Sequence, residues 1–298
     1  METVVDPRTR AVGLDAGIRP IDWSRPDPDA VPFRFEAPSG VLAGWSLGDP
    51  SSPRVVLLPG ATGSKEDFVL LAPPLARAGY YVQSYDLAGQ FESAAAGPSR
   101  TTGKWDYPLY VADLLAFLES GAPAHVLGYS FAGVVAQLVL AARPGLFLSL
   151  TLLTSPPLTG NVFRGVKIVG PFARFLSAHV GAGLMIWGIQ TNKNGVDDQR
   201  LAFVRDRLTV TRRESVDDII ELMMATPDVT AAVATSGVPL LIATGEHDLW
   251  PVRMHAEYAD RIGAELAVYR TGHSPCETTP NQLALDMITT FQRAEQPA

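Results

Sequence analysis

The chain has 298 residues, of which 47% are hydrophobic and 18% are charged, so it can bury a sizeable core and is not an intrinsically disordered chain. Its formal net charge is −7, which argues against nucleic acid as a partner, because surfaces that bind nucleic acid carry excess positive charge. The length fits one domain with an insertion, or two small domains.

Cysteine usage and the first residues of the chain bear on its location. Cys276 is the single cysteine, so no disulfide can form within the chain, and we expect this side chain to be a packing residue. Residues Met1–Pro7 lack the basic and then apolar segments of a signal peptide. The most apolar stretch, 175–189, contains His179 and three glycines, and it is too short and too broken for a membrane-spanning helix. We therefore expect a cytoplasmic protein, with a disulfide-free secreted protein as the alternative.

The N-terminal part of the chain predicts an arm followed by a hairpin. Residues 1–31 are polar and rich in proline, and we expect a loose N-terminal arm that Trp23, its only aromatic residue, pins to the body. Short apolar runs at 32–36 and 41–46 flank a Ser-Gly pair, which predicts a β-hairpin.

After the hairpin, predicted strands alternate with predicted helices. Strands are expected at 54–58, 80–85, 124–128, 147–153, 239–243 and 265–269. Helices are expected at 65–78, 108–120, 131–142, 252–262 and 281–293. Several of these strands are unbroken apolar runs, as expected of a mostly parallel sheet with helices on both faces. The pattern therefore predicts an α/β fold.

A long segment separates the last two predicted strands from the others. Residues 156–236 have helical periodicity, apolar in the first half and charged and amphipathic in the second. We expect this segment to be a separate helical unit, with the core at 32–155 and 237–298. Its basic cluster is interrupted by acidic residues, and we expect it to be a solvated helix face: Arg205, Arg207, Arg212 and Arg213.

One short motif predicts a nucleophile. Residues 128–133 read Gly-Tyr-Ser-Phe-Ala-Gly and lie where an apolar predicted strand meets an apolar predicted helix. Such a turn is tight, so Gly128 and Ala132 must be small, and it holds Ser130 in an unfavourable backbone conformation. The hydroxyl is then exposed at a helix N-terminus, which favours negative charge. A serine on an ordinary surface turn is the alternative, and the flanking strand and helix disfavour it.

Two other loops that follow predicted strands carry groups able to assist a serine, and the C-terminal ends of parallel strands meet at one edge of a sheet. His273 can act as a general base. Asp248 can orient that histidine, with Glu246 and His247 as rivals and helix capping as its alternative role. The remaining histidines are less favourable candidates, since they fall on a strand or in predicted helices: His125, His179 and His255.

The glycine-rich loop 58–64 follows the first buried strand. It can aim backbone N–H groups at a developing oxyanion, with a plain tight turn as the alternative. It lacks the glycine spacing of a phosphate-binding loop.

The order serine, aspartate, histidine along the chain, together with these loops, resembles the α/β-hydrolase fold superfamily over residues 32–295. The motifs that carry the resemblance are the loop 58–64, Asp86-Leu-Ala-Gly89 with Ser93, the turn 128–133, Gly245 to Asp248, and Gly272-His273 with Glu277 and Pro280. The resemblance implies the α/β-hydrolase fold with an inserted helical cap, or lid, at 156–236. It also implies that Asp86 is a structural residue.

The resemblance implies a serine hydrolase that cleaves a carboxylic ester or related acyl substrate through an acyl-enzyme. Ser130 would attack, His273 would transfer the proton, and Asp248 would hold the imidazole. The backbone N–H groups of Ala61 and Phe131 would bind the oxyanion. No metal and no organic cofactor would be needed.

Two departures from the family pattern stand out. Pro59-Gly60 replaces the common His-Gly, and Ala132 replaces a glycine. Thioester, amide, lactone or C–C hydrolysis and perhydrolysis on the same residues stay open, as does a ligand-binding protein without turnover. An epoxide hydrolase or dehalogenase is disfavoured, because the family equips these enzymes with aspartate where Ser130 stands.

The apolar half of the predicted cap suggests what the substrate is like. We expect Phe163, Phe172 and Trp187 to line a pocket for an apolar small-molecule acyl substrate. Basic residues scattered among these apolar ones leave a weaker option, contact with a membrane surface. The oligomeric state and the physiological substrate are not indicated by the sequence.

Overall fold

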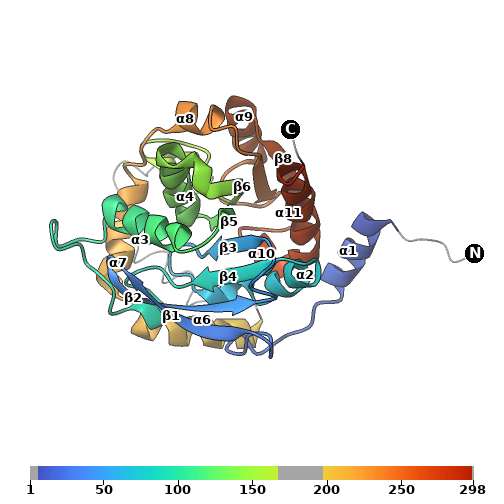
Figure 1. The fold of residues 1–298 in the computed structure, drawn as a ribbon, viewed down its shortest axis with the longest axis horizontal. Coiled ribbons are helices and arrows are strands. Elements are labelled where there is room, and N and C mark those ends of the chain that lie inside the picture. Colours follow the sequence, from blue (N-terminus) through green and yellow to red (C-terminus); the bar gives the residue numbers. More distant parts are fainter. Residues whose placement is uncertain (1–5, 167–196, 297–298) are drawn as a thin grey trace, which may run out of the picture.

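An eight-stranded sheet runs through the molecule in the computed structural model, which describes residues 6–166 and 197–296 (Figure 1). The strands are β1 (Val31–Ala37), β2 (Gly40–Leu47), β3 (Arg54–Leu58), β4 (Tyr81–Tyr85), β5 (Ala124–Tyr129), β6 (Phe147–Leu153), β7 (Leu240–Gly245) and β8 (Glu265–Tyr269). Their order in the sheet is β1-β2-β4-β3-β5-β6-β7-β8. β2 is antiparallel to both β1 and β4, and every neighbouring pair from β4 to β8 is parallel.

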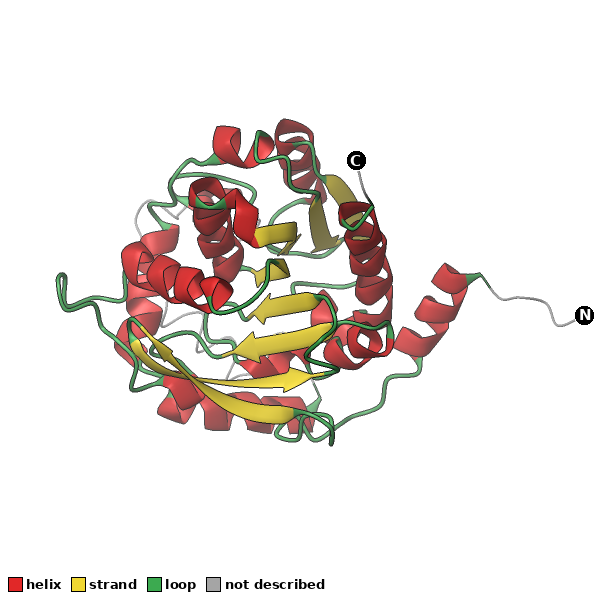
Figure 2. Ribbon diagram, in the orientation of Figure 1, coloured by secondary structure: helices red, strands yellow, loops and turns green. Residues whose placement is uncertain are grey.

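Helices cover both faces of this sheet (Figure 2). The main ones are α2 (Ala72–Arg77), α3 (Tyr107–Glu119), α4 (Phe131–Ala142), α9 (Val252–Ile262), α10 (Pro275–Thr278) and α11 (Pro280–Ala294). Side chains alternate along a strand, so β3 sends Val55 and Leu57 toward α2 and α11, and Val56 and Leu58 toward α3 and α4. Both sets are fully buried, which explains the unbroken apolar run in the sequence.

The predicted helix at 65–78 is wrong as a continuous element. The structure has a short 3₁₀ helix, η1 (Lys65–Phe68), and then α2, which begins at Ala72 with prolines in its first turn. Proline has no backbone N–H to donate and a fixed φ, so it suits the first turn of a new helix and not the interior of a long one.

The N-terminal segment is more ordered than we expected. It contains α1 (Pro7–Ala16), which packs against α11. Asp15 accepts hydrogen bonds from the backbone N–H groups of Asn281 and Gln282, at 2.8 and 3.1 Å, and Arg8 forms an ion pair with Asp286. A polar helix is therefore attached by polar contacts. Apolar periodicity in the sequence cannot reveal such a helix, because it has no apolar face to detect.

Between β6 and β7 the described residues are helical. They form η4 (Val162–Gly165), α6 (Asp198–Val210), α7 (Arg213–Met223) and α8 (Thr230–Ala234). The boundaries of the cap stay a prediction, because Phe172 and Trp187 lie outside the described residues. The expected solvated basic face is wrong for Arg207, which is 4% exposed and forms an ion pair with Asp67.

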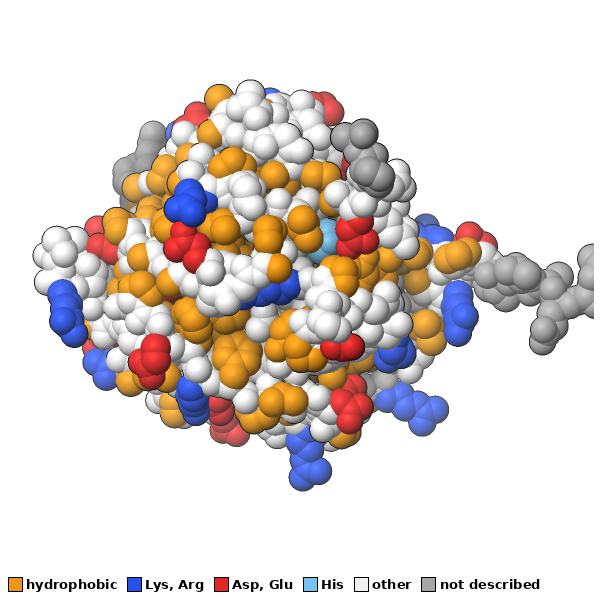
Figure 3. Space-filling model, in the orientation of Figure 1, with side chains coloured by type: hydrophobic (Ala, Val, Ile, Leu, Met, Phe, Trp, Pro, Cys, Tyr) orange, Lys and Arg blue, Asp and Glu red, His pale blue; other side chains and the backbone are white. Residues whose placement is uncertain are grey.

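Two features of the exterior bear on membranes. Within residues 6–166 and 197–296, none of the helices combines the length and the apolar character that crossing a bilayer requires. On the face drawn in Figure 3, acidic and basic side chains are interspersed among apolar ones.

Candidate active site

Ser130 lies in the turn between β5 and α4 and has φ of 51° and ψ of −119°. A positive φ is unfavourable for a residue with a side chain, so the surrounding structure must hold it. The Ser130 N–H donates to the carbonyl of Leu153 on the next strand at 2.9 Å, and the Gly133 N–H donates to the Ser130 carbonyl at 3.0 Å. The predicted strained serine at the start of a helix is present, but the predicted exposure is wrong, because Ser130 is buried and only 8% exposed.

The chain is packed very tightly around this turn. A Cβ atom added to Gly128 would lie 2.6 Å from the Gly133 Cα, and one added to Gly133 would lie 2.6 Å from the Ser155 Cβ and overlap its hydroxyl. A Cβ at Gly60 would lie 3.2 Å from the Ser130 Cβ. Gly128 and Gly133 must therefore both lack a side chain, and sequence reasoning named Gly128 but gave Ala132 in place of Gly133.

The structure brings together the three side chains that the sequence singled out. His273 Nε2 lies 3.2 Å from Ser130 Oγ, and His273 Nδ1 lies 2.5 Å from Asp248 Oδ1. A carboxylate can only accept hydrogen bonds, so Nδ1 carries the hydrogen and Nε2 is left as an acceptor that faces the serine. This arrangement suits removal of a proton from Ser130.

The carboxylate of Asp248 is fully buried and has a second histidine partner. His255 Nε2 lies 2.8 Å from Asp248 Oδ2, and the Thr244 hydroxyl is 3.4 Å from the same oxygen. Burial acting by itself would raise the pKa of Asp248, but the hydrogen bonds and charges of His255 and His273 outweigh it and hold that pKa well below its ordinary value. Asp248 is therefore a carboxylate at neutral pH.

The rival candidates Glu246, His247 and Asp86 make no hydrogen bond or ion pair with His273 or Ser130 among the described residues. The side chains of Glu246 and His247 are 44% and 78% exposed. Asp86 is buried, where it accepts from the Lys65 N–H at 2.8 Å and lies 3.1 Å from Lys65 Nζ. Burial raises the pKa of Asp86 to about 7 in spite of Lys65. These contacts give Asp86 a structural part in holding the loop that follows β3.

The remaining titratable candidates lie elsewhere. His125 is buried at the start of β5, between the Ser149 hydroxyl and Glu295. His179 lies outside the described residues. Cys276 is fully buried, and burial raises the pKa of its thiol well above the ordinary value. Cys276 is therefore a packing residue, as predicted.

Two backbone N–H groups adjoin Ser130 without a partner. Within the described ranges, neither the Ala61 N–H nor the Phe131 N–H donates a hydrogen bond. Ala61 follows Gly60, which touches the serine, and Phe131 is the first residue of α4. These positions are suitable for donors to an oxyanion.

A buried cluster of charges borders the site and was not predicted. Asp67 of η1 accepts from Arg200 at 2.7 Å and from Arg207 at 2.6 Å, and Arg200 also pairs with Glu277 of α10 at 2.5 Å. The Arg207 guanidinium donates to the Ser64 hydroxyl. Because its partners are far apart in the sequence, this cluster has no local signal. It ties α6 to the loop after β3 and to the helix after His273.

Of the three predicted pocket residues, the structure describes one. Phe163 lies in η4, which is held by a hydrogen bond from the Trp250 indole N–H to the Val162 carbonyl at 2.9 Å. The Trp250 ring centre lies 6.0 Å from that of His273, so η4 is close to the site. Phe163 itself is partly buried against the core, and its pocket role stays a prediction.

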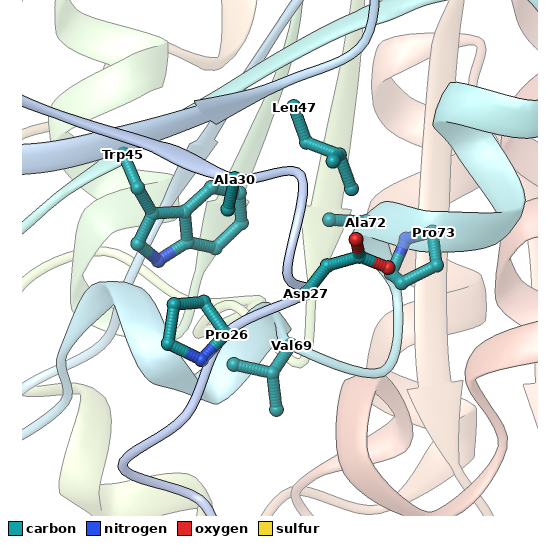
Figure 4. A pocket seen from close by; sticks show the side chains of 8 residues that line it. All are labelled: Pro26, Asp27, Ala30, Trp45, Leu47, Val69, Ala72 and Pro73. Atoms are coloured by element: carbon teal, nitrogen blue, oxygen red, sulfur yellow. The ribbon is translucent and has the colours of Figure 1, made fainter.

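A hollow on another part of the molecule does not belong to this site (Figure 4). It is lined by Pro26, Asp27, Ala30, Trp45, Leu47, Val69, Ala72 and Pro73. None of these residues comes from the four loops described above. Among the described residues there is also no group of three or more histidine, cysteine or acidic side chains placed to hold a metal ion.

Comparison with known proteins agrees with this geometry. The sequence profile of the alpha/beta hydrolase family matches residues 55–286, from β3 into α11. The chain belongs to the alpha/beta hydrolase family. No curated protein matches the sequence of this family member. The predicted fold class is confirmed by the profile and by the sheet.

Solved structures of similar fold carry several activities. The enol-lactonase from Burkholderia xenovorans is 19% identical, with a TM-score of 0.70 over 87% of this chain and 100% of that one. A structure from work on carboxylesterases of Nitrososphaera gargenis is 19% identical, with a TM-score of 0.70 over 88% and 98%. An epoxide hydrolase from Vigna radiata is 13% identical, with a TM-score of 0.71 over 89% and 98%. Likeness at this level shows the fold, so the reaction must be argued from the site.

Proposed function

We propose that this hydrolase is a serine hydrolase that cleaves a carboxylic ester or a related acyl substrate through an acyl-enzyme. The observation that carries the proposal is the chain of contacts from Ser130 Oγ through both nitrogens of His273 to the buried Asp248 carboxylate. The positive φ of Ser130 adds support, because strain of this kind is found where the backbone is held for function.

In the proposed reaction, His273 Nε2 takes the hydroxyl proton as Ser130 Oγ forms a bond to the substrate carbonyl carbon. The Ala61 and Phe131 N–H groups bind the resulting oxyanion. The carbonyl re-forms as the bond to the leaving group breaks, and His273 returns the proton to that group. Water then repeats these steps on the acyl-enzyme and releases the acid and Ser130. Asp248 stabilises the imidazolium in both halves, and no step calls on a cofactor.

Rival chemistries differ in what they require of the residue at position 130. Thioester, amide, lactone and C–C hydrolysis and perhydrolysis would use the same three side chains, so the substrate class remains part of the proposal. Epoxide hydrolysis in this family uses an aspartate nucleophile, and the chain has Ser130 there. A ligand-binding protein without turnover would not need the Nε2 acceptor of His273 directed at a strained serine.

The experiment is hydrolysis of p-nitrophenyl esters by the wild type and by Ser130→Ala, with the fold monitored by circular dichroism. We expect the variant to fold normally and to lose nearly all turnover, since a hydrolase of this kind without its nucleophile retains only about 10³–10⁴-fold acceleration over water. A variant that keeps more than a tenth of the wild-type rate would disprove Ser130 as the nucleophile. Wild-type protein that turns over no acyl substrate would favour the binding protein.

A further inference from the structure

His255 occupies an unusual position for a histidine. It lies on the face of α9 that also contains Tyr258, Ala259 and Ile262, all buried against the core. A side chain at this position is normally apolar, because burying a polar group costs free energy unless it is hydrogen-bonded. His255 is 1% exposed and meets this requirement through Asp248 Oδ2 at 2.8 Å.

The contact determines the protonation of the ring. The carboxylate of Asp248 accepts only, so His255 Nε2 must carry a hydrogen and donate it. Each oxygen of Asp248 then has its own histidine donor, His273 on Oδ1 and His255 on Oδ2. Without His255, Oδ2 would be buried with only the Thr244 hydroxyl at 3.4 Å.

We propose that His255 is a positioning residue that fixes the plane of the Asp248 carboxylate and so sets the orientation of His273 toward Ser130. The inference rests on the proposed function and adds a fourth side chain to it. Two donors at opposite oxygens prevent the carboxylate from rotating about its Cβ–Cγ bond. A fixed Oδ1 holds His273 Nδ1–H, and this keeps Nε2 facing the serine hydroxyl.

The same contact also affects charge. A hydrogen bond from His255 spreads part of the negative charge of Asp248, so less of it acts on His273. Removing His255 should therefore stabilise the His273 imidazolium and move the acid limb of the pH–rate profile to higher pH. A residue that merely filled space in α9 would not move that limb.

Among the described residues, Asp248 is the charged side chain that contacts His273, and the other neighbours of the ring are aromatic or paired elsewhere. The Tyr129 ring, on β5, has its centre 5.5 Å from that of His273, and its hydroxyl bonds the Ser274 hydroxyl. The Trp250 ring lies 6.0 Å away. On α10, Glu277 is paired with Arg200 of α6. The pH readout therefore reports mainly on the carboxylate that His255 contacts.

The test compares four variants of the full chain. His255→Leu removes the donor at similar volume, and His255→Asn keeps an amide that is too short to reach. His255→Gln places an amide N–H near the position of Nε2. His125→Leu is the matched control, since it removes a buried histidine that contacts Glu295 at the far end of β5 from Ser130. The readouts are kcat, KM and the pH–rate profile on a p-nitrophenyl ester, with thermal unfolding.

We expect His255→Leu and His255→Asn to lower kcat about tenfold, which corresponds to about 1.4 kcal/mol, with little change in KM and with the acid limb at higher pH. His255→Gln should recover most of kcat and the wild-type limb. His125→Leu should lower the unfolding temperature and leave kcat, KM and the pH–rate profile unchanged.

Three results would overturn the inference. One is wild-type kcat and acid limb in both His255→Leu and His255→Asn. Another is an equal loss of kcat in His255→Gln and His255→Asn. The third is a shift of the acid limb in His125→Leu as large as that in the His255 variants. If His255→Leu does not fold, the pair Asn and Gln decides the question. Failure of the proposed function looks different, since either the wild type would then hydrolyse no ester or Ser130→Ala would keep more than a tenth of the wild-type rate.

Discussion

Glycines that have no chemistry of their own decide whether the residues of this site can meet. Gly60 and Gly133 allow the loop after β3 and the end of β6 to approach the Ser130 turn. A Cβ on Gly245 would overlap the Gly272 carbonyl, so the loops that carry Asp248 and His273 touch backbone to backbone. The spacing of the three reactive side chains therefore depends on positions where only a hydrogen fits.

Gly133→Ala should test this dependence. The added methyl would meet the Cβ of Ser155, which lies two residues beyond the end of β6 and cannot move without its backbone, so we expect a loss of about 1–3 kcal/mol in the free energy of unfolding. Activity should fall with it, because Ser130 would be displaced from His273. Urea unfolding and ester hydrolysis measure the two effects.

The control for that substitution is Gly145→Ala. A Cβ at Gly145 has nothing within 4 Å, so we expect a change within about 0.5 kcal/mol and unaltered kcat. Equal stability and equal activity in the two variants would show that the packing around Ser130 is looser than the structure indicates.

At the scale of elements, buried ion pairs hold α6 against η1, which follows the loop after β3, and against α10, which follows His273. Asp67, Arg200, Arg207 and Glu277 are almost completely removed from water. Buried pairs of this kind contribute little net stability compared with apolar packing, but removing one partner leaves the other charge buried without compensation. Their effect here is to couple α6, the segment that follows β3 and the helix that follows His273.

Asp67→Asn should therefore be strongly destabilising. It removes the carboxylate shared by Arg200 and Arg207, and we expect a loss of about 3–5 kcal/mol in the free energy of unfolding. Glu257→Gln is the control, since it breaks an exposed pair with Arg253 on α9 and should change the urea midpoint very little. Similar midpoints for the two variants would mean that the buried cluster is open to water in solution.

At the scale of the whole molecule, the described part of the segment between β6 and β7 packs onto the core beside the site. η4 contacts Trp250, and α7 adds Ile219 and Met223 to the core cluster on the α3 and α4 face. A reacting group under such a cover would share its surroundings with apolar side chains. We therefore expect the enzyme to select substrates by the length of their apolar acyl chain.

Catalytic efficiency should then rise with acyl length until the pocket is full. Burial of each methylene contributes about 0.8 kcal/mol, which corresponds to about fourfold in kcat/KM per carbon. A series of p-nitrophenyl esters from acetyl upward measures this. An efficiency that is highest for acetyl and falls steadily with length would contradict the apolar pocket. Adding anionic lipid vesicles tests the weaker membrane-surface option, and unchanged activity would count against it.

The sequence by itself predicted most of the strands and helices of the core and the three candidate residues of the site. Apolar periodicity gave β3, β6, β8, α4 and α9 with the bounds that the structure has, because strands and helices that are buried on a face repeat at fixed intervals. Ser130, Asp248 and His273 each follow a predicted strand, and the C-terminal ends of parallel strands lie at one edge of the sheet. The sequence therefore predicted that the three residues meet there. Their catalytic roles and the oxyanion donors stay predictions until they are assayed.

Only the tertiary structure decided the partners. His255 looked like an ordinary helix residue, Arg207 like a solvated one, and residues 7–16 like part of a loose arm. Each was misjudged because its contact, with Asp248, Asp67 or α11, lies far away in the chain. A local pattern records whether a side chain suits water or the core. It does not record which distant charge will be folded against that side chain, although a buried polar or charged group must have such a partner.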